Sequence, residues 1–142
     1  MTELKASRIA MAALLLACLS AVNSARATEY QMHEMQLTIP FDFYIDDRLM
    51  PAGNYEAVAF DNAVRFNNTT AHTAAGILTQ QLNASPGVFT PVVIFNKYGD
   101  DYFLREMWWG VGTNVGSMTM TSKLENELAR STHPIRIASK GR

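Results

Sequence analysis

Apolar and polar residues alternate with a period of two over short stretches of the chain after residue 30. The first stretch carries the apolar residues Met35, Leu37, Ile39, Phe41, Phe43 and Ile45, with mostly polar residues between them. Successive side chains of a β-strand point to opposite faces, so this alternation predicts strands with one buried face. Pro40 interrupts the stretch, and because proline cannot donate a ladder hydrogen bond, it predicts a bend or an edge position there.

Turn-forming residues separate the alternating stretches at intervals of roughly 8–12 residues, which is typical of all-β domains. Turns or loops are expected at 46–47, 51–54, 61–62, 67–70, 83–87 and 110–117. Strands are expected at 35–39, 41–45, 55–60, 63–66, 73–82, 92–98 and 102–109. Because Asp and Asn tolerate positive φ, the pair at 61–62 predicts a tight hairpin between its flanking strands.

A short helix is expected after the last strand, over the sequence SKLENELAR at 122–130. Ser122 followed by Glu125 three residues later is the pattern of a capping box at a helix N-terminus. Leu124 and Leu128 are four residues apart and form an apolar stripe, which would pack on the sheet.

The strands and the helix together predict one all-β domain over residues 28–130. It would be an antiparallel β-sandwich or a partly closed β-barrel with one short C-terminal helix. The alternation does not distinguish these two architectures. Residues 131–142 are expected to form a solvated, frayed C-terminal tail.

The first 27 residues have the pattern of a secretory signal peptide. Lys5 and Arg8 precede an apolar run at 9–19, and an A-x-A cleavage site ends at Ala27. The run is shorter than the about 20 apolar residues that a transmembrane anchor needs. We therefore expect export to the periplasm or outside the cell. Lipid attachment at Cys18 is an alternative, because Cys18 follows the lipoprotein-like sequence Leu-Leu-Ala.

Charge and cysteine content narrow the functional classes. Cleavage after residue 27 would remove three of the 12 basic and one of the 13 acidic residues, which leaves 9 and 12 and a net charge of −3. Such a chain is a poor nucleic-acid binder, because phosphate contacts need clustered Lys and Arg. Cys18 is the only cysteine, so the cleaved chain would have no disulfide and no thiolate site. No transmembrane helix is expected after cleavage.

Three motifs resemble those of a family of small exported β-domain proteins of the acidobacterial type. They are IPFDF with LMPAGNY at 39–55, YGDDYFLREMW at 98–108 and SKLENELA at 122–129. The resemblance implies an exported β-domain and no particular activity, because the family has none that carries over. The chain departs from the family pattern at Trp109, in the methionine-rich SMTMTS and in the tail after residue 130.

No catalytic residue, cofactor or metal site is expected. The G-x-S-x-G motif is absent, and His33, His72 and His133 are scattered along the chain. The carboxylate pairs at 46–47 and 100–101 fall where turns are expected, so turn formation explains them. Copper binding is a weaker alternative, because methionine commonly fills cores and the spacing matches no closed site. Its ligands would be Met32, His33, Met35, Met118 and Met120.

The strongest hairpin signal joins the expected strands 92–98 and 102–109. With 100–101 as the loop, the cross-strand pairs are Asn96–Arg105, Ile94–Met107 and Val92–Trp109. Polar then meets polar and apolar meets apolar, which cross-strand pairing favours. A loop at 99–100 would instead set Ile94 against Arg105, which is a poorer match.

Strand alternation divides residues 102–109 between two faces. One face would carry Tyr102, Leu104, Glu106 and Trp108, and the other would carry Phe103, Arg105, Met107 and Trp109. Neither face is cleanly polar, so both are expected to be partly covered. We expect Phe103, Met107 and Trp109 to face the core. Trp108 is then the more exposed tryptophan, unless it packs under the C-terminal helix.

Trp108 and its neighbour Tyr102 are therefore the candidate ligand-binding residues. Aromatic side chains combine apolar area with a polar group and recur in binding sites. The sequence predicts a non-enzymatic exported domain that binds a small molecule, a glycan or an envelope protein. The alternative is a structural or assembly component of the cell envelope that acts through exposed strand edges.

Overall fold

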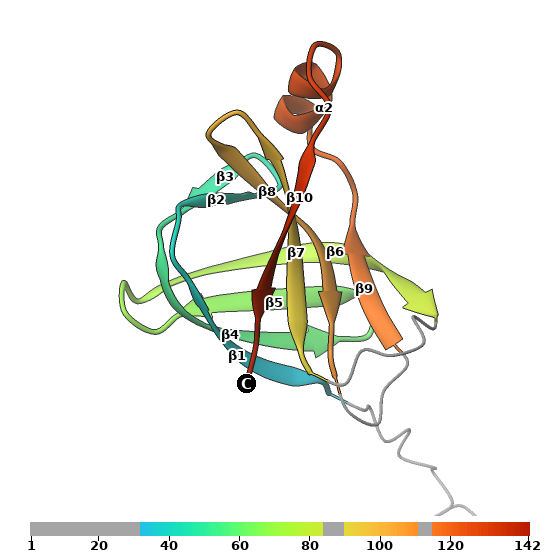
Figure 1. Ribbon diagram of the computed structural model, residues 1–142. Coiled ribbons are helices and arrows are strands. Elements are labelled where there is room, and N and C mark those ends of the chain that lie inside the picture. Colours follow the sequence, from blue (N-terminus) through green and yellow to red (C-terminus); the bar gives the residue numbers. More distant parts are fainter. Residues whose placement is uncertain (1–31, 84–89, 111–114) are drawn as a thin grey trace, which may run out of the picture.

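The computed structural model describes residues 32–83, 90–110 and 115–142, which form a β-rich unit with a short helix (Figure 1). The expected signal peptide, its cleavage site and Cys18 lie outside the described residues. Within the described ranges, no helix has the length and apolar character needed to cross a membrane.

Ten strands and one helix are found in the described residues. The strands are β1 (Glu34–Ile39), β2 (Phe43–Ile45), β3 (Arg48–Met50), β4 (Gly53–Phe60), β5 (Ala63–Asn68), β6 (Thr73–Asn83), β7 (Val92–Tyr98), β8 (Asp101–Trp108), β9 (Val115–Thr119) and β10 (Ile135–Lys140). The helix is α2 (Lys123–Ala129). Each strand that the alternation predicted is present, with bounds that differ from the expected ones by no more than two residues.

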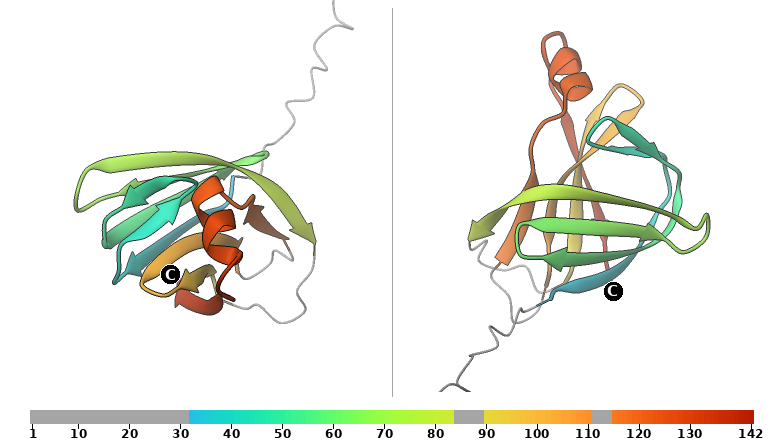
Figure 2. Two further views of the ribbon diagram at one scale, coloured as in Figure 1. Left: turned by 90° about the horizontal axis from the view of Figure 1, so that it is seen from above. Right: turned by 180° about the vertical axis from the view of Figure 1, so that it is seen from behind.

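The strands form two layers that share β6. β1, β4, β5 and the first half of β6 pair in antiparallel order. The second half of β6 pairs with β9, from which the sheet continues through β8 and β7 to β10. β2 and β3 form a small hairpin that joins β8 by one parallel bridge, Tyr44 to Phe103. In Figure 2 the strands of the first layer run across those of the second.

The outermost strands, β1 and β10, meet at one bridge between Leu37 and Gly141. Beside it, Gln36 and Arg142 exchange backbone hydrogen bonds of 3.2 and 2.7 Å. The ladder does not continue along the rest of these two strands, so the sheet is not closed into a barrel. The predicted all-β fold is confirmed, as a sandwich with a short C-terminal helix.

The hydrophobic core lies between the two layers. In β1, Met35, Leu37 and Ile39 are at most 4% exposed, and the residues between them are exposed. The centre of the core is an aromatic cluster whose rings meet edge to face at centroid distances of 5.2–6.4 Å. Its members are Phe43, Tyr55, Phe66 and Phe95. Edge-to-face contact suits the aromatic quadrupole and adds to the stabilisation from buried area.

The residues after Arg130 form a strand, so the expectation of a frayed C-terminal tail is wrong. β10 pairs with β7 in antiparallel register over its whole length. Ile137 packs against the core, while Arg136 and Ala138 beside it are exposed. β10 has no fully buried side chain, so its sequence carries little of the alternation that marks the other strands.

The glycine-rich segment 110–117, which we expected to be a loop, overlaps the first three residues of β9. This strand pairs with β6 on one side and with β8 on the other. Glycine has low β-propensity, and Gly116 is present because the side chain of Trp108 lies against it. Residues 111–114 of the same segment lie outside the described residues.

The helix α2 begins as predicted. Ser122 is the N-cap, and its Oγ accepts a hydrogen bond of 3.1 Å from the backbone nitrogen of Glu125. The expected apolar stripe contributes less than predicted, because Leu124 and Leu128 are only half-buried. The most deeply buried residue of the helix is Glu125, which is 2% exposed.

The Glu125 carboxylate anchors α2 to β7. It accepts hydrogen bonds from Asn96 Nδ2 at 2.9 Å and from the Tyr98 hydroxyl at 3.4 Å. Burial raises the pKa of Tyr98 above its ordinary value of 10.0, and the negative charge of Glu125 raises it further. The helix is therefore held at this end of β7 by a buried polar cluster.

Candidate functional site

The β7–β8 hairpin turns at Gly99-Asp100, one residue earlier than predicted. Tyr98 pairs with Asp101 across the turn, and Gly99 adopts φ +60°. Two-residue hairpin loops need positive φ, which glycine adopts without steric cost. The predicted register, which was chosen to pair polar with polar and apolar with apolar side chains, is wrong. The need for a residue with positive φ in the turn outweighs that pairing.

A β-bulge at Arg105 changes the register again further along the hairpin. The pairing shifts between Ile94 and Phe95, so that Ile94 lies opposite Glu106 and Arg105 has no residue opposite it on β7. The Arg105 guanidinium instead donates from Nη1 to the carbonyl of Thr119 at 2.6 Å. The bulge thereby removes the unfavourable Ile94–Arg105 pair that a regular ladder would impose.

The bulge also places Tyr102 and Trp108 on opposite sides of the sheet. Tyr102 pairs with Lys97, and Trp108 pairs with Val92. Lys97 and Val92 are five residues apart on β7, so their side chains point to opposite faces. The two residues that the sequence predicted as one site are therefore not brought together.

Tyr102 lies on the core side of β8. Its ring stacks on Phe41 with the ring centroids 3.9 Å apart, and Nζ of Lys97 lies 5.1 Å from the Tyr102 centroid. The side chain is half-buried against the hydrophobic core. Because neighbouring side chains already contact its ring, Tyr102 covers the border of the core.

Trp108 lies on the outer side of the sheet, over β9. A Cβ placed on Gly116 would come within 2.7 Å of Trp108 Cε3 and within 2.9 Å of Cδ2 and Cζ3. Such similar distances to three consecutive ring atoms mean that the indole turns a flat face, rather than an edge, toward Gly116. The indole therefore rests on the backbone of β9, and its other flat face points away from the sheet.

The alternative that Trp108 packs under the C-terminal helix is wrong. The helix is anchored at Asn96 and Tyr98, toward one end of β7. Trp108 pairs with Val92, at the other end of the same strand. Trp108 is half-buried by β9 and remains partly open to solvent.

Glu106 joins Trp108 to a cation on β10. Nε1 of Trp108 donates to Glu106 Oε2 at 3.1 Å, and Nη2 of Arg136 lies 2.8 Å from Glu106 Oε1. The Glu106 side chain is 14% exposed and that of Arg136 is 56% exposed. One mostly covered carboxylate therefore orients both an aromatic ring and a more exposed guanidinium.

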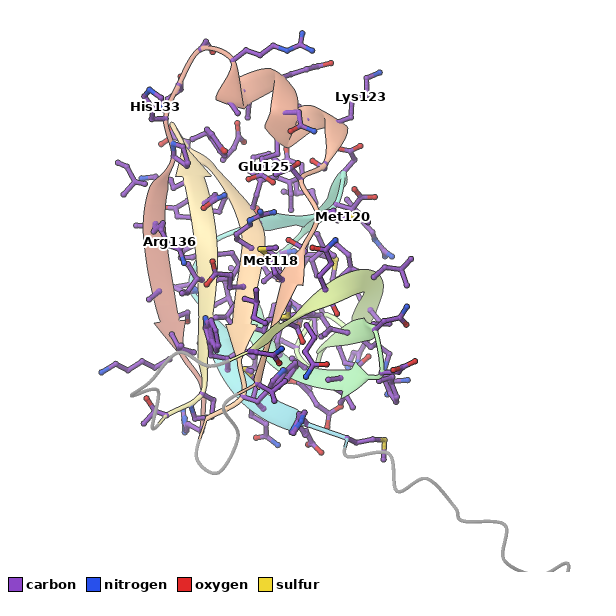
Figure 3. The ribbon with its side chains drawn as sticks, turned by 90° about the vertical axis from the view of Figure 1, so that its right-hand side faces the viewer. Met118, Met120, Lys123, Glu125, His133 and Arg136 are labelled. Atoms are coloured by element: carbon purple, nitrogen blue, oxygen red, sulfur yellow. The ribbon has the colours of Figure 1, made fainter. Side chains whose placement is uncertain are left out.

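Cross-strand pairing shows which side chains surround Trp108. The row through Trp108 contains Lys140, Val92, Trp108, Gly116 and Leu82. The next row contains Ala138, Ile94, Glu106, Met118 and Gln80. Apart from Gly116, these residues are half-buried or exposed. We call the two rows, together with Arg136, the Trp108 face. Figure 3 looks onto it, with Arg136 on β10, Met118 toward the other side and α2 at one end.

Met107 and Trp109 face the core as predicted, whereas Phe103 does not. Trp109 is 6% exposed, donates from Nε1 to Ser117 Oγ at 3.2 Å and stacks on His33 at a centroid distance of 6.0 Å. Met107 is buried on the core side. Phe103 is also buried, but the bulge puts it on the opposite side of the sheet from Met107.

Residues with catalytic or metal-binding potential are dispersed. His33 stacks on Trp109, His72 occupies a turn with φ +53°, and His133 is exposed. Among the described residues, no three His, Cys, Asp or Glu side chains are grouped so as to hold a metal ion. The pair at 46–47 forms the turn between β2 and β3, as its composition predicted.

Two hollows of the surface are lined by residues outside the Trp108 face. One has a volume of about 350 Å³ and is lined mainly by polar residues of β1 and β4, together with Arg142. The other has a volume of about 390 Å³ and is lined by Asp46, Gly76, Ile77, Leu78, Met120 and Thr121. The Trp108 face differs from both hollows in that an aromatic ring and a guanidinium are held by one carboxylate.

Glu106, Arg136 and Gly116 were not identified as site residues from the sequence. Arg136 fell in the expected tail and Gly116 in the expected loop, while Glu106 counted only as one charge on a mostly apolar strand. The available signal was the adjacent Arg105-Glu106 pair. Two neighbouring charges within an apolar strand are compatible with a bulge, which turns successive side chains away from strict alternation.

Comparison of the chain with protein-family models, with curated proteins and with solved structures finds no match. The resemblance to small exported β-domain proteins stays a prediction.

Proposed function

We propose that the protein is an exported, non-enzymatic domain that binds a glycan on the Trp108 face. The observation that carries this proposal is the indole of Trp108, which lies flat on Gly116 and is oriented by Glu106. A ring held in one orientation loses little conformational freedom when a ligand binds, which favours affinity.

The chemistry of the Trp108 face suits a sugar ring. The flat faces of an indole carry partial negative charge, so they attract the weakly positive C–H groups on the apolar side of a pyranose. Beside the ring, Glu106 is an acceptor, Arg136 a donor and Gln80 both, and each can bond to sugar hydroxyls. One stacked ring and a few exposed hydrogen bonds support a Kd of about 0.1–1 mM.

Export is supported by the composition of residues 1–27, whose charged start, apolar run and A-x-A site are typical of a signal peptide. A non-enzymatic role is supported by the dispersal of the three histidines and by the turn position of the aspartate pair at 46–47. Binding without chemistry needs an oriented surface, and the Trp108 face supplies one.

Assembly through strand edges has weaker support. β1 and β10 contact each other through the Leu37–Gly141 bridge and the hydrogen bonds beside it. These contacts occupy part of the free edge of each strand. β3 is an edge strand of only three residues, and short edges are poor templates for pairing. Sedimentation velocity should show a monomer whose sedimentation coefficient is independent of concentration. A concentration-dependent oligomer would favour the assembly role.

Glycan binding is testable by calorimetric titration of the chain with cellotetraose, xylotetraose, chitotetraose and two uronic acid tetramers. We expect at least one to bind, and Trp108→Ala to weaken that binding at least about fivefold, because stacking is lost. Trp108→Phe keeps a smaller ring and should retain part of the affinity.

The matched control is Phe60→Ala, because Phe60 is 39% exposed and ends β4 away from the Trp108 face. It should bind like the unchanged chain, and thermal unfolding should show that each variant is folded. The proposal fails if no tetrasaccharide binds. It also fails if a folded Trp108→Ala variant binds as tightly as the unchanged chain.

A further inference from the structure

We infer that the glycan bound at the Trp108 face is acidic, and that Arg136 receives a carboxylate of a hexuronic acid residue stacked near Trp108. This inference rests on the proposed function and adds the chemical class of the ligand. It follows from the position and exposure of two cations on the Trp108 face.

The first observation is the placement of Arg136 next to the aromatic ring. The Arg136 guanidinium and the Trp108 indole nitrogen contact the two oxygens of the same Glu106 carboxylate. The Trp108 indole and the Arg136 guanidinium are therefore separated by the width of one carboxylate group. A sugar ring on the indole would place a substituent on its rim within reach of the guanidinium.

The second observation is that the guanidinium keeps binding capacity. The Arg136 side chain is 56% exposed, and its contact with Glu106 is made through Nη2. A guanidinium has five N–H donors in a planar fork that matches a carboxylate, so one partner does not saturate it. The Glu106 side chain is only 14% exposed. Of the two charged groups in this ion pair, the positively charged guanidinium therefore has the greater contact with solvent.

The third observation is a second cation on the same strand and side. Lys140 lies four residues after Arg136 on β10 and belongs to the cross-strand row of Trp108. Lys140 is exposed, and within the described residues it forms no salt bridge. Ala138, which is exposed, lies between the two cations on β10, and its small side chain does not separate them.

The charges on the Trp108 face therefore sum to a positive value. The face holds two cations, Arg136 and Lys140, and one carboxylate, Glu106, in a chain with 12 basic and 13 acidic residues in total. An anionic ligand gains from both cations, whereas a neutral sugar gains only hydrogen bonds. Arg–carboxylate pairs are stronger and more directional than neutral hydrogen bonds.

Matched ligands separate charge from shape. We would titrate the chain with the tetramers of galacturonic acid and mannuronic acid, and with their methyl esters, which keep the sugar skeleton and lose the charge. We expect each acid to bind about fivefold tighter than its ester at low salt, as for exposed ion pairs. The difference should disappear in 1 M NaCl, where the screening length falls to about 3 Å.

Two substitutions should change the acid-to-ester affinity ratio in opposite directions. Arg136→Gln removes one of the two cations and should lower the ratio toward one. Glu106→Gln removes the competing carboxylate, keeps an acceptor for the Trp108 indole, and should raise the ratio. Lys123→Gln is the charge control, because Lys123 is exposed on α2 away from this face. It should leave the ratio unchanged.

The outcomes distinguish this inference from the proposed function. Equal affinity for acid and ester, with Trp108→Ala still weakening both, overturns the acidic ligand and leaves glycan binding in place. A ratio that Lys123→Gln lowers as much as Arg136→Gln also overturns it, because the effect would then come from total charge. If neither the acidic tetramers, their esters nor the neutral tetramers bind, both the acidic ligand and the proposed glycan binding are overturned.

Discussion

Trp108 lies flat on β9 because residue 116 has no side chain. Gly116→Ala would place a Cβ 2.7 Å from Trp108 Cε3, and the indole would have to lift from the strand. We expect the free energy of unfolding to fall by about 1–3 kcal/mol, as for other overpacked sites. Glycan binding should fall with it, since the ring loses its orientation. Urea denaturation measures the first effect and calorimetric titration the second.

Gly76→Ala is the matched control for that substitution. Gly76 also lies within a strand, but the nearest atom to its added Cβ is the carbonyl oxygen of Val64 at 3.9 Å, which is ordinary contact. Its stability should change little, and its glycan binding should not change. If Gly116→Ala behaved like Gly76→Ala in both measurements, the indole would not depend on Gly116 for its orientation.

At the scale of elements, the helix α2 depends on a polar anchor that changes the titration of a tyrosine. Burial and the charge of Glu125 both raise the pKa of Tyr98. Glu125→Gln removes the charge and leaves the burial, so the pKa of Tyr98 should fall toward 10.0 without reaching it. Tyrosinate absorbance against pH measures this, with Tyr98→Phe identifying which transition belongs to Tyr98. An unchanged Tyr98 transition in Glu125→Gln would contradict the anchor.

The same shift sets the direction of the pH dependence of stability. The Tyr98 hydroxyl has a higher pKa in the folded chain than its ordinary value of 10.0. Its contribution to stability is therefore complete below about pH 10 and is lost as the pH rises through the raised folded pKa. Burial also raises the pKa of Tyr55, so both residues favour unfolding in the same alkaline range. Tyr98→Phe should lessen the loss of stability there.

Elements were predictable where one face of a strand is buried, and less so where distant contacts decide. The alternation of Met35, Leu37 and Ile39 predicted β1 and its core face. The hairpin β7–β8 was predictable as a hairpin, but its register was not. The sequence allowed a loop at 99–100 or at 100–101. The loop at 99–100 is favourable because of the bulge at Arg105, which is a local distortion. Its effect is large, because a one-residue change moves every later side chain to the other face.

For the whole molecule, the fold class could be read from the sequence and the candidate site only in part. Burial of apolar surface fixes an all-β architecture through a pattern repeated in many segments, so errors in single segments do not change it. The Trp108 face depends on single pairings between distant segments: Glu106 with Arg136, and Trp108 with Gly116. The greater exposure of Trp108 than of Trp109 was predictable, and the partners that orient Trp108 were not.

The C-terminal strand offers the sharpest test of the whole architecture. A frayed tail could be removed without effect, whereas β10 pairs with β7 over six residue pairs and ends in hydrogen bonds to Gln36. Deletion of residues 131–142 should lower the free energy of unfolding by at least about 2–5 kcal/mol, the cost of deleting one large apolar side chain from a core. Urea denaturation of the truncated and full chains measures this, and equal midpoints would contradict the role of β10.

Two substitutions on β10 test the strand without removing Arg136. Ile137 packs against the core, so Ile137→Ala should cost about 1–3 kcal/mol. Ile135 is 64% exposed, so Ile135→Ala should change the free energy of unfolding by no more than about 0.5 kcal/mol. Both variants retain Arg136 and Lys140. If Ile137→Ala loses stability but still binds the glycan, the structural role of β10 is separate from the ligand-binding role of its two cations.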